Sequence, residues 1–460
     1  MQLITLAENE SLDSAQLPRE GVLPAEITAA AAEIIQHVRE HKDQALREYC
    51  LRFDGVAPEN FSVAQSELNA ALSAVDPEFL AALEKAAAQI RDFHGREVTQ
   101  SWFTTKADGT LLGVKVTPLP SVGIYVPGGR AQYPSTVLMN AIPAKVAGVK
   151  RVVMVTPPQQ SGGISPYTLA AAKIAGVDEV YAIGGAQAIA ALAYGTESIP
   201  RVAKVTGPGN AYVAAAKRLV SGDVGIDMVA GPSEVCVLVD ASADATVVAA
   251  DLMAQAEHDP LAACYLVTCD AEFAQKVQDR VDFLVAESPR AEITRASLDT
   301  HGVVVVAPNL DTAVDAVNVI APEHLELHCE NALGLLGKIE NAGAIFVGPW
   351  SSEPLGDYLA GPNHTLPTGG TALFSSPLSV DEFVKKSSVL SYTPQGVAND
   401  GAAVQTLAQA EGLWAHALSV GLRRKLIADG LSNFDGVELT NIGKIAWPKQ
   451  LAPVQDPECE

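Results

Sequence analysis

The sequence has few cysteines and few cations. Its 460 residues include 6 cysteines, none of them in a C-x-x-C pair. This pattern excludes a disulfide framework and a thiolate zinc knuckle, so we expect reduced thiols and a cytoplasmic protein. Lysine and arginine total 31 against 54 acidic residues, a formal net charge of −23. Because binding of a phosphate backbone requires clustered cations, a nucleic-acid partner is disfavoured.

Unbroken apolar runs and a targeting segment are also missing. The most apolar stretch, 180–196, contains three glycines and a glutamine, which favours a buried strand, loop and helix over a membrane span. The N-terminal MQLITLAENE has no basic region typical of a signal peptide. The hydrophobic content of 48% excludes disorder over most of the chain, and the length indicates two or three lobes. We therefore expect a folded protein without a membrane partner.

Short β-branched runs alternate with alanine-rich helical windows over two parts of the chain. The alternation spans 121–240 and resumes after 240, which predicts βαβ units and two parallel sheets. A leading segment, 25–93, has a helical pattern with Thr28 as a possible N-cap, and 402–431 is helical again. Between them, 348–380 is rich in Pro, Gly, Ser and Thr. A long irregular segment of this kind typically lines a functional site.

Three glycine-containing loops follow predicted strands, at 126–130, 183–187 and 206–210. Loops at the carboxyl ends of parallel strands lead into helix N-termini, which attract phosphates. The third resembles a dinucleotide fingerprint, with Gly207-x-Gly209 and Asp227 twenty residues after Gly207. Tyr212 replaces the last glycine of that motif, which we expect to obstruct close packing of helix on strand. Ordinary strand-to-helix turns remain an alternative for all three loops.

Two segments contain spacings that suit metal binding or proton transfer. Gln255 and His258 stand i,i+3 at a predicted helix end, where they could reach one ion or lie at the surface. The segment 321–328 has two interpretations. As a helix, it places His324 and His328 one turn apart; as a strand, it directs both to one face together with Glu326. Adjacent Glu323 and His324 then suit proton transfer, although a polar edge strand explains the pattern equally well.

Four further polar residues are candidates with a surface role as the default. Asp357 and His364 lie in the irregular segment 348–380. Glu411 and His416 are five positions apart, about 140° around a regular helix, so they diverge unless Gly412 breaks the helix. No cysteine has an activating histidine nearby in the sequence, so a catalytic thiol is unsupported.

Seven strings of the sequence together resemble the histidinol dehydrogenase family. They occur in the family's order, cover about residues 25 to 430, and are far more specific than any single motif above. The strings are GIYVPGGRAQYPSTVLMNAIPAKVAGV, GGAQAIAALAYGT, VTGPGNAYVAAAK, DMVAGPSEV, DLMAQAEHDP, APEHLEL and PLGDYLAGPNHTLPTGGTALFSSPLSVDEF.

The resemblance implies an NAD-dependent enzyme that oxidises L-histidinol through L-histidinal to L-histidine, with one zinc ion per subunit. It implies that Glu323 and His324 are the acid-base catalysts. The implied zinc ligands are Gln255, His258, Asp357 and His416. The implied substrate-binding residues are these four with Glu323, Ser233, His364 and Glu411, and the implied cofactor contacts are Tyr125, Gln187 and Asn210. Since a full G-x-G-x-x-G is missing, we expect a family-specific and weak mode of NAD binding.

The resemblance also implies an α/β fold of two incomplete Rossmann-like lobes with parallel sheets, in a homodimer. We expect an N-terminal arm at 1–24 and a first lobe from 25–118 with 234–378. We expect a cofactor-binding second lobe at 119–233 and a C-terminal helical tail at 379–460, swapped between subunits so that Glu411 and His416 serve the partner's site. A dehydrogenase of another small polar alcohol, such as a sulfonate diol, and a zinc hydrolase are the alternatives; Ser233, His364 and Glu411 favour histidinol.

Overall fold

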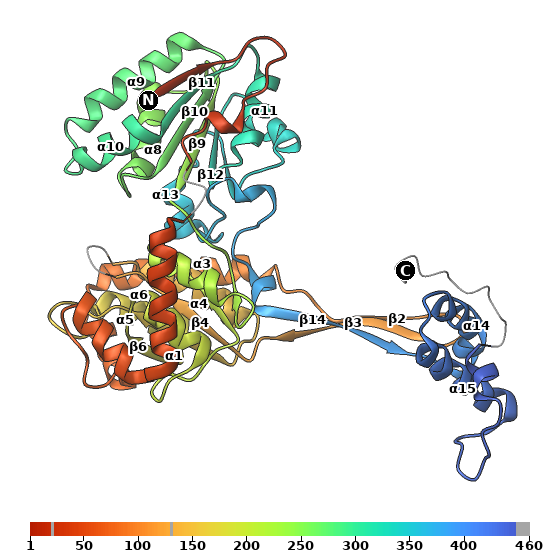
Figure 1. Cartoon of the computed structure of the whole chain (residues 1–460). Helices are drawn as coiled ribbons and strands as arrows, with labels where there is room; N and C mark the ends of the chain where they lie inside the picture. The colour runs from red at the N-terminus through yellow and green to blue at the C-terminus, as the bar shows by residue number, and fades with distance from the viewer. Residues whose placement is uncertain (20–22, 129–131, 448–460) are drawn as a thin grey trace. The chain divides into compact units, whose positions relative to one another are not determined.

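The computed structural model of the chain describes residues 1–19, 23–128 and 132–447 (Figure 1). It divides into two units, Met1–Val98 with Pro118–Val384, and Thr99–Thr117 with Lys385–Glu460. Two positions of the first predicted loop, 129 and 130, and the predicted frayed end 456–460 lie outside the described residues. In the described part of the chain, no helix has the length and apolarity to span a bilayer. The five described cysteines are free, as expected.

A five-stranded parallel sheet, formed by strands between residues 121 and 226, makes up one lobe of the larger unit. Its order is β6-β5-β4-β7-β8, and all neighbouring strands run parallel. The first four strands along the chain correspond to β-branched runs of the sequence and are mostly buried, whereas the two-residue fifth strand does not correspond to such a run. The strands are β4 (Ser121–Tyr125), β5 (Arg151–Thr156), β6 (Glu179–Ala182), β7 (Lys204–Thr206) and β8 (Gly225–Ile226). The apolar stretch 180–196 is a strand, a loop and a helix, as predicted.

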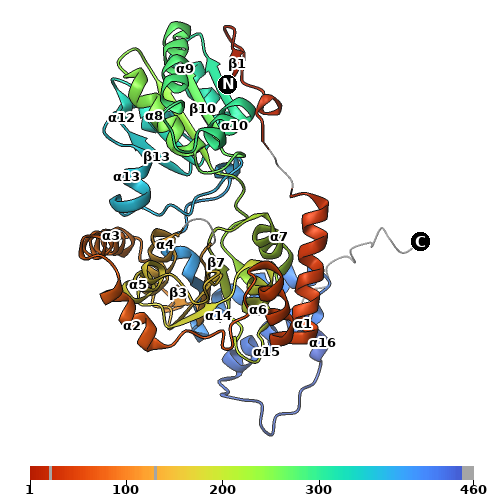
Figure 2. The same ribbon diagram turned by 90° about the vertical axis from the view of Figure 1, so that its left-hand side faces the viewer.

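Helices cover both faces of this sheet (Figure 2). One face packs against α1 (Ala25–Phe53), α6 (Gly185–Tyr194) and α7 (Ala211–Val220). The other packs against α2 (Gln65–Ala74), α3 (Pro77–Gly95), α4 (Pro134–Val146) and α5 (Pro166–Ala175). The segment 25–95 therefore belongs to this lobe, whereas the sequence assigned it to the other. An apolar helix face does not specify which sheet it covers. The N-cap of α1 is Pro24, with Thr28 inside the helix.

A six-stranded parallel sheet, of order β1-β11-β10-β9-β12-β13, forms the other lobe (Figure 1). Its strands are β1 (Gln2–Thr5), β9 (Glu234–Val239), β10 (Ala263–Thr268), β11 (Gly302–Val306), β12 (His324–His328) and β13 (Ala344–Val347). The predicted N-terminal arm thus supplies an edge strand. The segment 324–328 is extended and pairs on both sides, so the interpretation as an edge strand is wrong.

Two groups of helices cover the six-stranded sheet. One face packs against α8 (Ala245–Ala256), α9 (Ala271–Val285) and α10 (Ala291–His301). The other packs against α11 (Leu310–Ile320) and α12 (Ala332–Leu335). The segment after β13 is mainly irregular, as predicted, with a short α13 (Glu353–Leu355) that runs into a π-helical turn at Gly356–Ala360.

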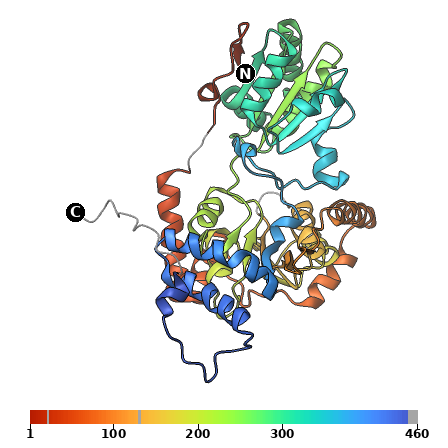
Figure 3. The same cartoon turned by 90° about the vertical axis from the view of Figure 1, so that its right-hand side faces the viewer.

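The described residues of the smaller unit form an antiparallel ribbon and three helices. The strands β2 (Trp102–Thr105), β3 (Leu111–Pro118) and β14 (Val384–Ser391) form a sheet of order β14-β3-β2, which the sequence reading did not predict. The helices are α14 (Pro394–Ala410), α15 (Trp414–Asp429) and α16 (Ile442–Ala446), drawn in blue in Figure 3. Gly412, at φ +71°, breaks the predicted helical region between α14 and α15.

A buried ion pair holds the third predicted loop. The Lys217 ammonium lies 2.5 Å from Oδ1 of Asp227 and donates to the Gly207 carbonyl oxygen at 2.9 Å. The Gly207 N–H donates to Oδ2 of Asp227 at 2.8 Å. Asp227 therefore holds the loop 206–210 in place. This does not support the interpretation of Asp227 as the ribose-binding acid of a dinucleotide fingerprint. The Tyr212 ring is exposed and does not obstruct the packing of α7.

Replacing Lys217 by methionine will strongly destabilise the protein. The Asp227 side chain is 0% exposed, so loss of the cation leaves a buried carboxylate without a counter-charge. We expect a decrease of about 3–5 kcal/mol in the free energy of unfolding, measured by chemical denaturation. Lys338→Met is the matched control, because its ion pair with Asp311 is largely exposed and should contribute less than about 1 kcal/mol. Equal losses in the two variants would contradict the prediction.

Candidate active site

The start of β12 holds the predicted catalytic pair against the start of β9. The Glu234 N–H donates to Oε2 of Glu323 at 2.9 Å, and Nδ1 of His324 lies 3.0 Å from the Glu234 carbonyl oxygen. Since that oxygen can only accept, Nδ1 carries a proton in this bond and Nε2 of the neutral ring is left with its lone pair. Both side chains are buried. One backbone position thus orients an acid and a base.

Asp357 faces the free side of His324. Its Oδ1 lies 3.5 Å from Nε2 of His324. Burial raises the pKa of Asp357, but the hydrogen bond and charge of His324, followed by the charges of His364 and His258, lower it below the ordinary value. Burial also lowers the pKa of His324, but the Glu323 charge and Asp357 outweigh burial and raise it. The buried charges are therefore strongly interdependent.

His364 is held beside Asp357 by its own loop. Its Nδ1 bonds to the Asp357 carbonyl oxygen at 3.0 Å, and its Nε2 lies 3.4 Å from Oγ1 of Thr136 in α4. Burial lowers the pKa of His364, so the neutral ring is favoured. Sequence reasoning placed His364 in an irregular segment with no defined partner. The structure shows it anchored at both ring nitrogens.

The end of α8 supplies Gln255 and His258. Gln255 is 1% exposed, and both its amide oxygen and its amide nitrogen have no hydrogen-bond partner among the described residues. Desolvation lowers the pKa of His258, against the opposing effect of the Asp357 carboxylate. A buried amide without a partner is costly, so this side chain is suited to a ligand. A neutral imidazole and an ionised carboxylate are the forms that bind a metal ion.

The other predicted site residues have different settings. Ser233 is half-buried directly before β9, and its carbonyl oxygen accepts from the Ala263 N–H. Glu411 and His416 are exposed and belong to the smaller unit, at the end of α14 and in the first turn of α15. Gly412 separates them, so they need not share a helix face. The larger unit therefore brings together the candidate metal-binding and acid-base residues at the end of α8, at the start of β12 and in the segment 357–364, without Glu411 and His416.

The three predicted cofactor residues lie at the carboxyl ends of strands in the five-stranded sheet. Tyr125 ends β4, and its hydroxyl oxygen accepts from the Gly185 N–H at 3.1 Å. Gln187 lies in the first turn of α6, buried, with Oε1 lacking a hydrogen-bond partner among the described residues. Asn210 is the N-cap of α7. These helix N-termini are suited to the phosphates of a nucleotide.

Glycines allow the loops around these residues to pack closely. A Cβ on Gly207 would lie 2.2 Å from the Tyr125 carbonyl oxygen, so the β7 loop directly contacts the end of β4. Gly128 and Gly184 both pack against Pro157, which follows β5. The described parts of the three predicted loops are therefore grouped at one edge of the sheet, as expected for a parallel α/β lobe.

Comparison with known proteins identifies the family. Residues 17–424 match the family model described as histidinol dehydrogenase. A histidinol dehydrogenase of Bacillus cereus is 50% identical over 425 residues, 92% of this chain and 99% of that protein. One of Syntrophotalea carbinolica is 54% identical over 404 residues, 87% of this chain and 94% of that protein. The chain belongs to the histidinol dehydrogenase family.

The fold agrees with a solved member of that family. The crystal structure of a histidinol dehydrogenase from Elizabethkingia anophelis superposes with a TM-score of 0.88 at 36% identity, covering 93% of this chain and 99% of that one. Histidinol dehydrogenases are oxidoreductases of histidine biosynthesis. The expected family and the α/β fold with parallel sheets are thereby confirmed.

Sequence reasoning missed two buried acids near the candidate site. Glu353 at the start of α13 is buried, and ligand atoms of Glu353, His324 and Asp357 all lie within 4.8 Å of one another. Burial outweighs the opposing charge of His324 and raises the pKa of Glu353 to about 7. The carboxylate of Glu234 is also buried, beside Arg19. Neither acid belongs to a recognisable spacing, so only burial identifies them, Glu353 beside His324 and Glu234 beside Arg19.

Replacing Arg19 by methionine will destabilise the protein in a pH-dependent way. Nε of Arg19 donates to Oε1 of Glu234 at 3.1 Å, and burial keeps the pKa of Glu234 above its usual 4.5. Without Arg19 this pKa rises further. A carboxyl pKa that is higher in the folded than in the unfolded protein lowers the free energy of unfolding when the pH is above the folded-state pKa. This loss disappears as the pH falls towards the unfolded-state pKa. We expect a loss of about 2–4 kcal/mol at pH 8.

Denaturant unfolding at pH 8 and pH 5 measures this effect. The loss caused by Arg19→Met should be clearly smaller at pH 5, because the Glu234 carboxyl can then be protonated. Arg19→Lys keeps the positive charge and should show a smaller loss at pH 8. A loss of the same size at both pH values would show that Arg19 acts through packing alone.

Proposed function

We propose that this chain oxidises L-histidinol through L-histidinal to L-histidine, in two hydride transfers to NAD at a zinc-containing site. The observation that carries the proposal is the pair at the start of β12, where Nδ1 of His324 is held by the Glu234 carbonyl oxygen and Nε2 is left for proton transfer. A position of this kind is what a general base for an alcohol requires.

The residues of the larger unit fit a zinc ion. The unpartnered amide of Gln255, the His258 ring and the Asp357 carboxylate supply oxygen and nitrogen donors of the kind that zinc binds. His416 of the smaller unit is the fourth proposed ligand. When bound, zinc would hold the imidazole and amino nitrogens of histidinol and orient the alcohol carbon towards the nicotinamide.

His324 would act in the first oxidation. Its Nε2 accepts the hydroxyl proton of histidinol as hydride leaves the alcohol carbon. The charges of Glu323 and Asp357 raise its pKa. If Asp357 bound the metal ion, its negative charge would act less strongly on His324. The pKa of the His324 ring would then lie closer to neutral pH, as a general base requires. His364 and Ser233 would contact the substrate from the sides.

Glu323 would act in the second oxidation. Its Oε2 is fixed by the Glu234 N–H, and burial raises the pKa of its carboxyl to about 8. A carboxylate with a raised pKa can take a proton from water as that water adds to the aldehyde, so that the second hydride leaves from the hydrate. The two adjacent residues would then divide the proton transfers of the two oxidations.

NAD would bind at the carboxyl edge of the five-stranded sheet, in the predicted cofactor-binding lobe 119–233. Gln187 offers a buried amide oxygen with no partner among the described residues, and Tyr125 and Asn210 lie in the neighbouring loops. NAD supplies the acceptor for hydride. Since Asp227 is occupied by Lys217 and Gly207, the ribose must be recognised by other groups, consistent with a family-specific mode.

We further propose a cytoplasmic homodimer that exchanges the C-terminal tail 379–460. Glu411 and His416 are exposed in the smaller unit, available to a second copy of the chain. In this arrangement Glu411 would bind substrate and His416 would complete the zinc ligands of the partner's site. Each site would then contain one zinc ion and residues from both subunits.

NADH formation from histidinol tests the activity. Zinc-loaded protein with excess NAD should form about two molecules of NADH per histidinol. Removal of zinc by a chelator should abolish the absorbance change, and added zinc should restore it. His258→Ala should bind zinc poorly and remain inactive with zinc added. Absence of NADH formation with bound zinc and NAD would refute the proposal, and one NADH per histidinol would refute the second oxidation.

Mixing two inactive variants tests the tail exchange. His258→Ala and His416→Ala damage different parts of the proposed ligand set. If tails are exchanged, a mixed dimer contains one intact site, and an equal mixture that redistributes randomly should regain about a quarter of wild-type activity. If each tail serves its own chain, every site in the mixture is damaged. No recovery after proven subunit exchange would exclude the swapped arrangement.

A further inference from the structure

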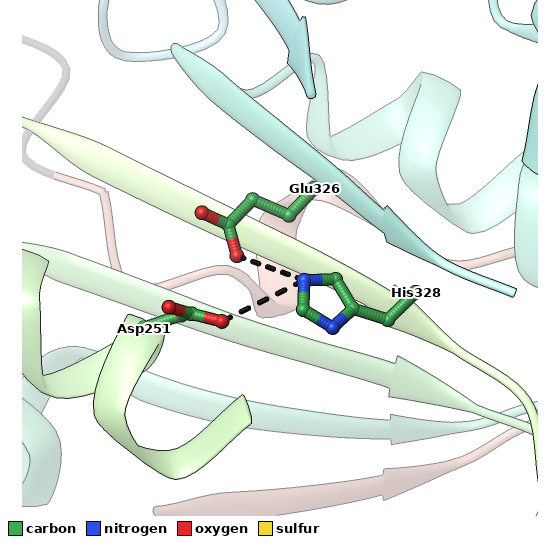
Figure 4. A group of neighbouring side chains, drawn as sticks. All are labelled: Asp251, Glu326 and His328. Carbon is green, nitrogen blue, oxygen red and sulfur yellow. Dashed lines mark ion pairs between the residues drawn. The ribbon is translucent and has the colours of Figure 1, made fainter. Parts of the chain in front are cut away.

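A second group of buried polar side chains lies behind the candidate active site. It consists of Asp251 on α8 with Glu326 and His328 on β12, here called the buried triad (Figure 4). Nε2 of His328 is 3.4 Å from Oε2 of Glu326 and 3.6 Å from Oδ2 of Asp251. Both carboxylates point to the same ring nitrogen (Figure 4). All three residues are buried, and none of them takes part in the proposed reaction or zinc site.

The charged groups of the buried triad face one another: the His328 ring lies between the Asp251 and Glu326 carboxylates. Oδ2 of Asp251, Oε2 of Glu326 and both ring nitrogens of His328 have no hydrogen-bond partner among the described residues. Nε2 faces both carboxylates, so a proton there would be shared between them, and one cation would offset one of the two negative charges. Removal of one member leaves the others buried without compensation, which is strongly unfavourable.

Within the larger unit, the buried triad lies on or contacts the elements that carry the proposed zinc ligands and His324. Oε1 of Glu326 accepts from the Glu353 N–H at 2.8 Å, at the start of α13, which runs directly into the turn with Asp357. Asp251 lies one turn of α8 before Gln255. Glu326 lies two residues after His324 on the same face of β12.

We propose that Asp251, Glu326 and His328 are positioning residues, which hold α8 and the turn at 353–357 at the separation that the zinc ligands Gln255, His258 and Asp357 require. The inference rests on the proposed zinc site and deepens it. Groups that orient metal ligands from behind commonly change metal affinity by about 10- to 100-fold when they are removed. Their influence here is transmitted through helix and turn positions, without contact with substrate.

The same side chains could be interpreted as a second cation site, since their ligand atoms lie within 4.8 Å of one another. Two observations favour positioning. Oε1 of Glu326 is already engaged by the Glu353 N–H. The second ring nitrogen of His328 has no partner among the described residues, whereas a metal-binding histidine almost always donates from it.

The rate of zinc release to a chelator, measured on the folded full-length protein, tests the proposal. Glu326→Leu removes both the charge and the acceptor for the Glu353 N–H, and should speed zinc release about tenfold or more. Glu326→Gln keeps that acceptor and should have a smaller effect, as should Asp251→Asn. Val304→Ala is the matched control: it removes buried volume from the same face of the sheet, on β11. It should lower the melting temperature without changing zinc release.

The possible outcomes separate this inference from the proposed function. Zinc release from Glu326→Leu at the wild-type rate, or changed only as much as in Val304→Ala, would overturn the positioning role while leaving the zinc site intact. Two zinc ions per wild-type chain, with one lost in Glu326→Gln and Asp251→Asn, would overturn it in favour of a cation site. Should Glu326→Leu fail to fold, the two conservative variants decide. A wild-type chain that binds no zinc would refute both proposals.

Discussion

The pairing of β9 with β12 is the constraint on which the candidate site depends. In their parallel register His324 lies opposite Val235, so the backbone of the preceding residue, Glu234, reaches both Glu323 and His324. One peptide position orients an acid and selects the free nitrogen of a base. A shift of this register by one residue would turn the alternating polar side chains of β12 to the opposite face and separate them from α8.

The two lobes use opposite edges of their sheets. The candidate cofactor loops lie at the carboxyl edge of the five-stranded sheet, where helix N-termini attract phosphates. The proposed catalytic pair lies at the amino edge of the six-stranded sheet, where β12 begins and α8 ends. The end of α8 and the irregular segment after β13 bring Gln255 and Asp357 to that edge. The proposed proton transfer and nucleotide binding therefore draw on different features of the same kind of lobe.

Local patterns predicted local structure well and spatial grouping poorly. Most strands of the two parallel sheets, the βαβ alternation and the irregular segment were predictable, because β-branched runs and glycine-rich turns act over a few residues. The assignment of 25–95 to a lobe was wrong, because an apolar helix face fits any apolar sheet. Asp227 had the spacing of a ribose-binding acid, yet Lys217 and Gly207 occupy it. The position of a residue in a sequence motif does not show which groups it contacts in the folded protein.

By itself, the sequence determined the family and the parallel α/β character and led to the proposed site residues, because these depend on order and identity along the chain. Only the tertiary structure decided that β12 is an interior strand, that His324 bonds through Nδ1, and that Glu353 joins it. The same holds for the buried triad behind the site. These features depend on which strands pair and which carboxylates lose water, and both are settled by contacts between segments far apart in the sequence.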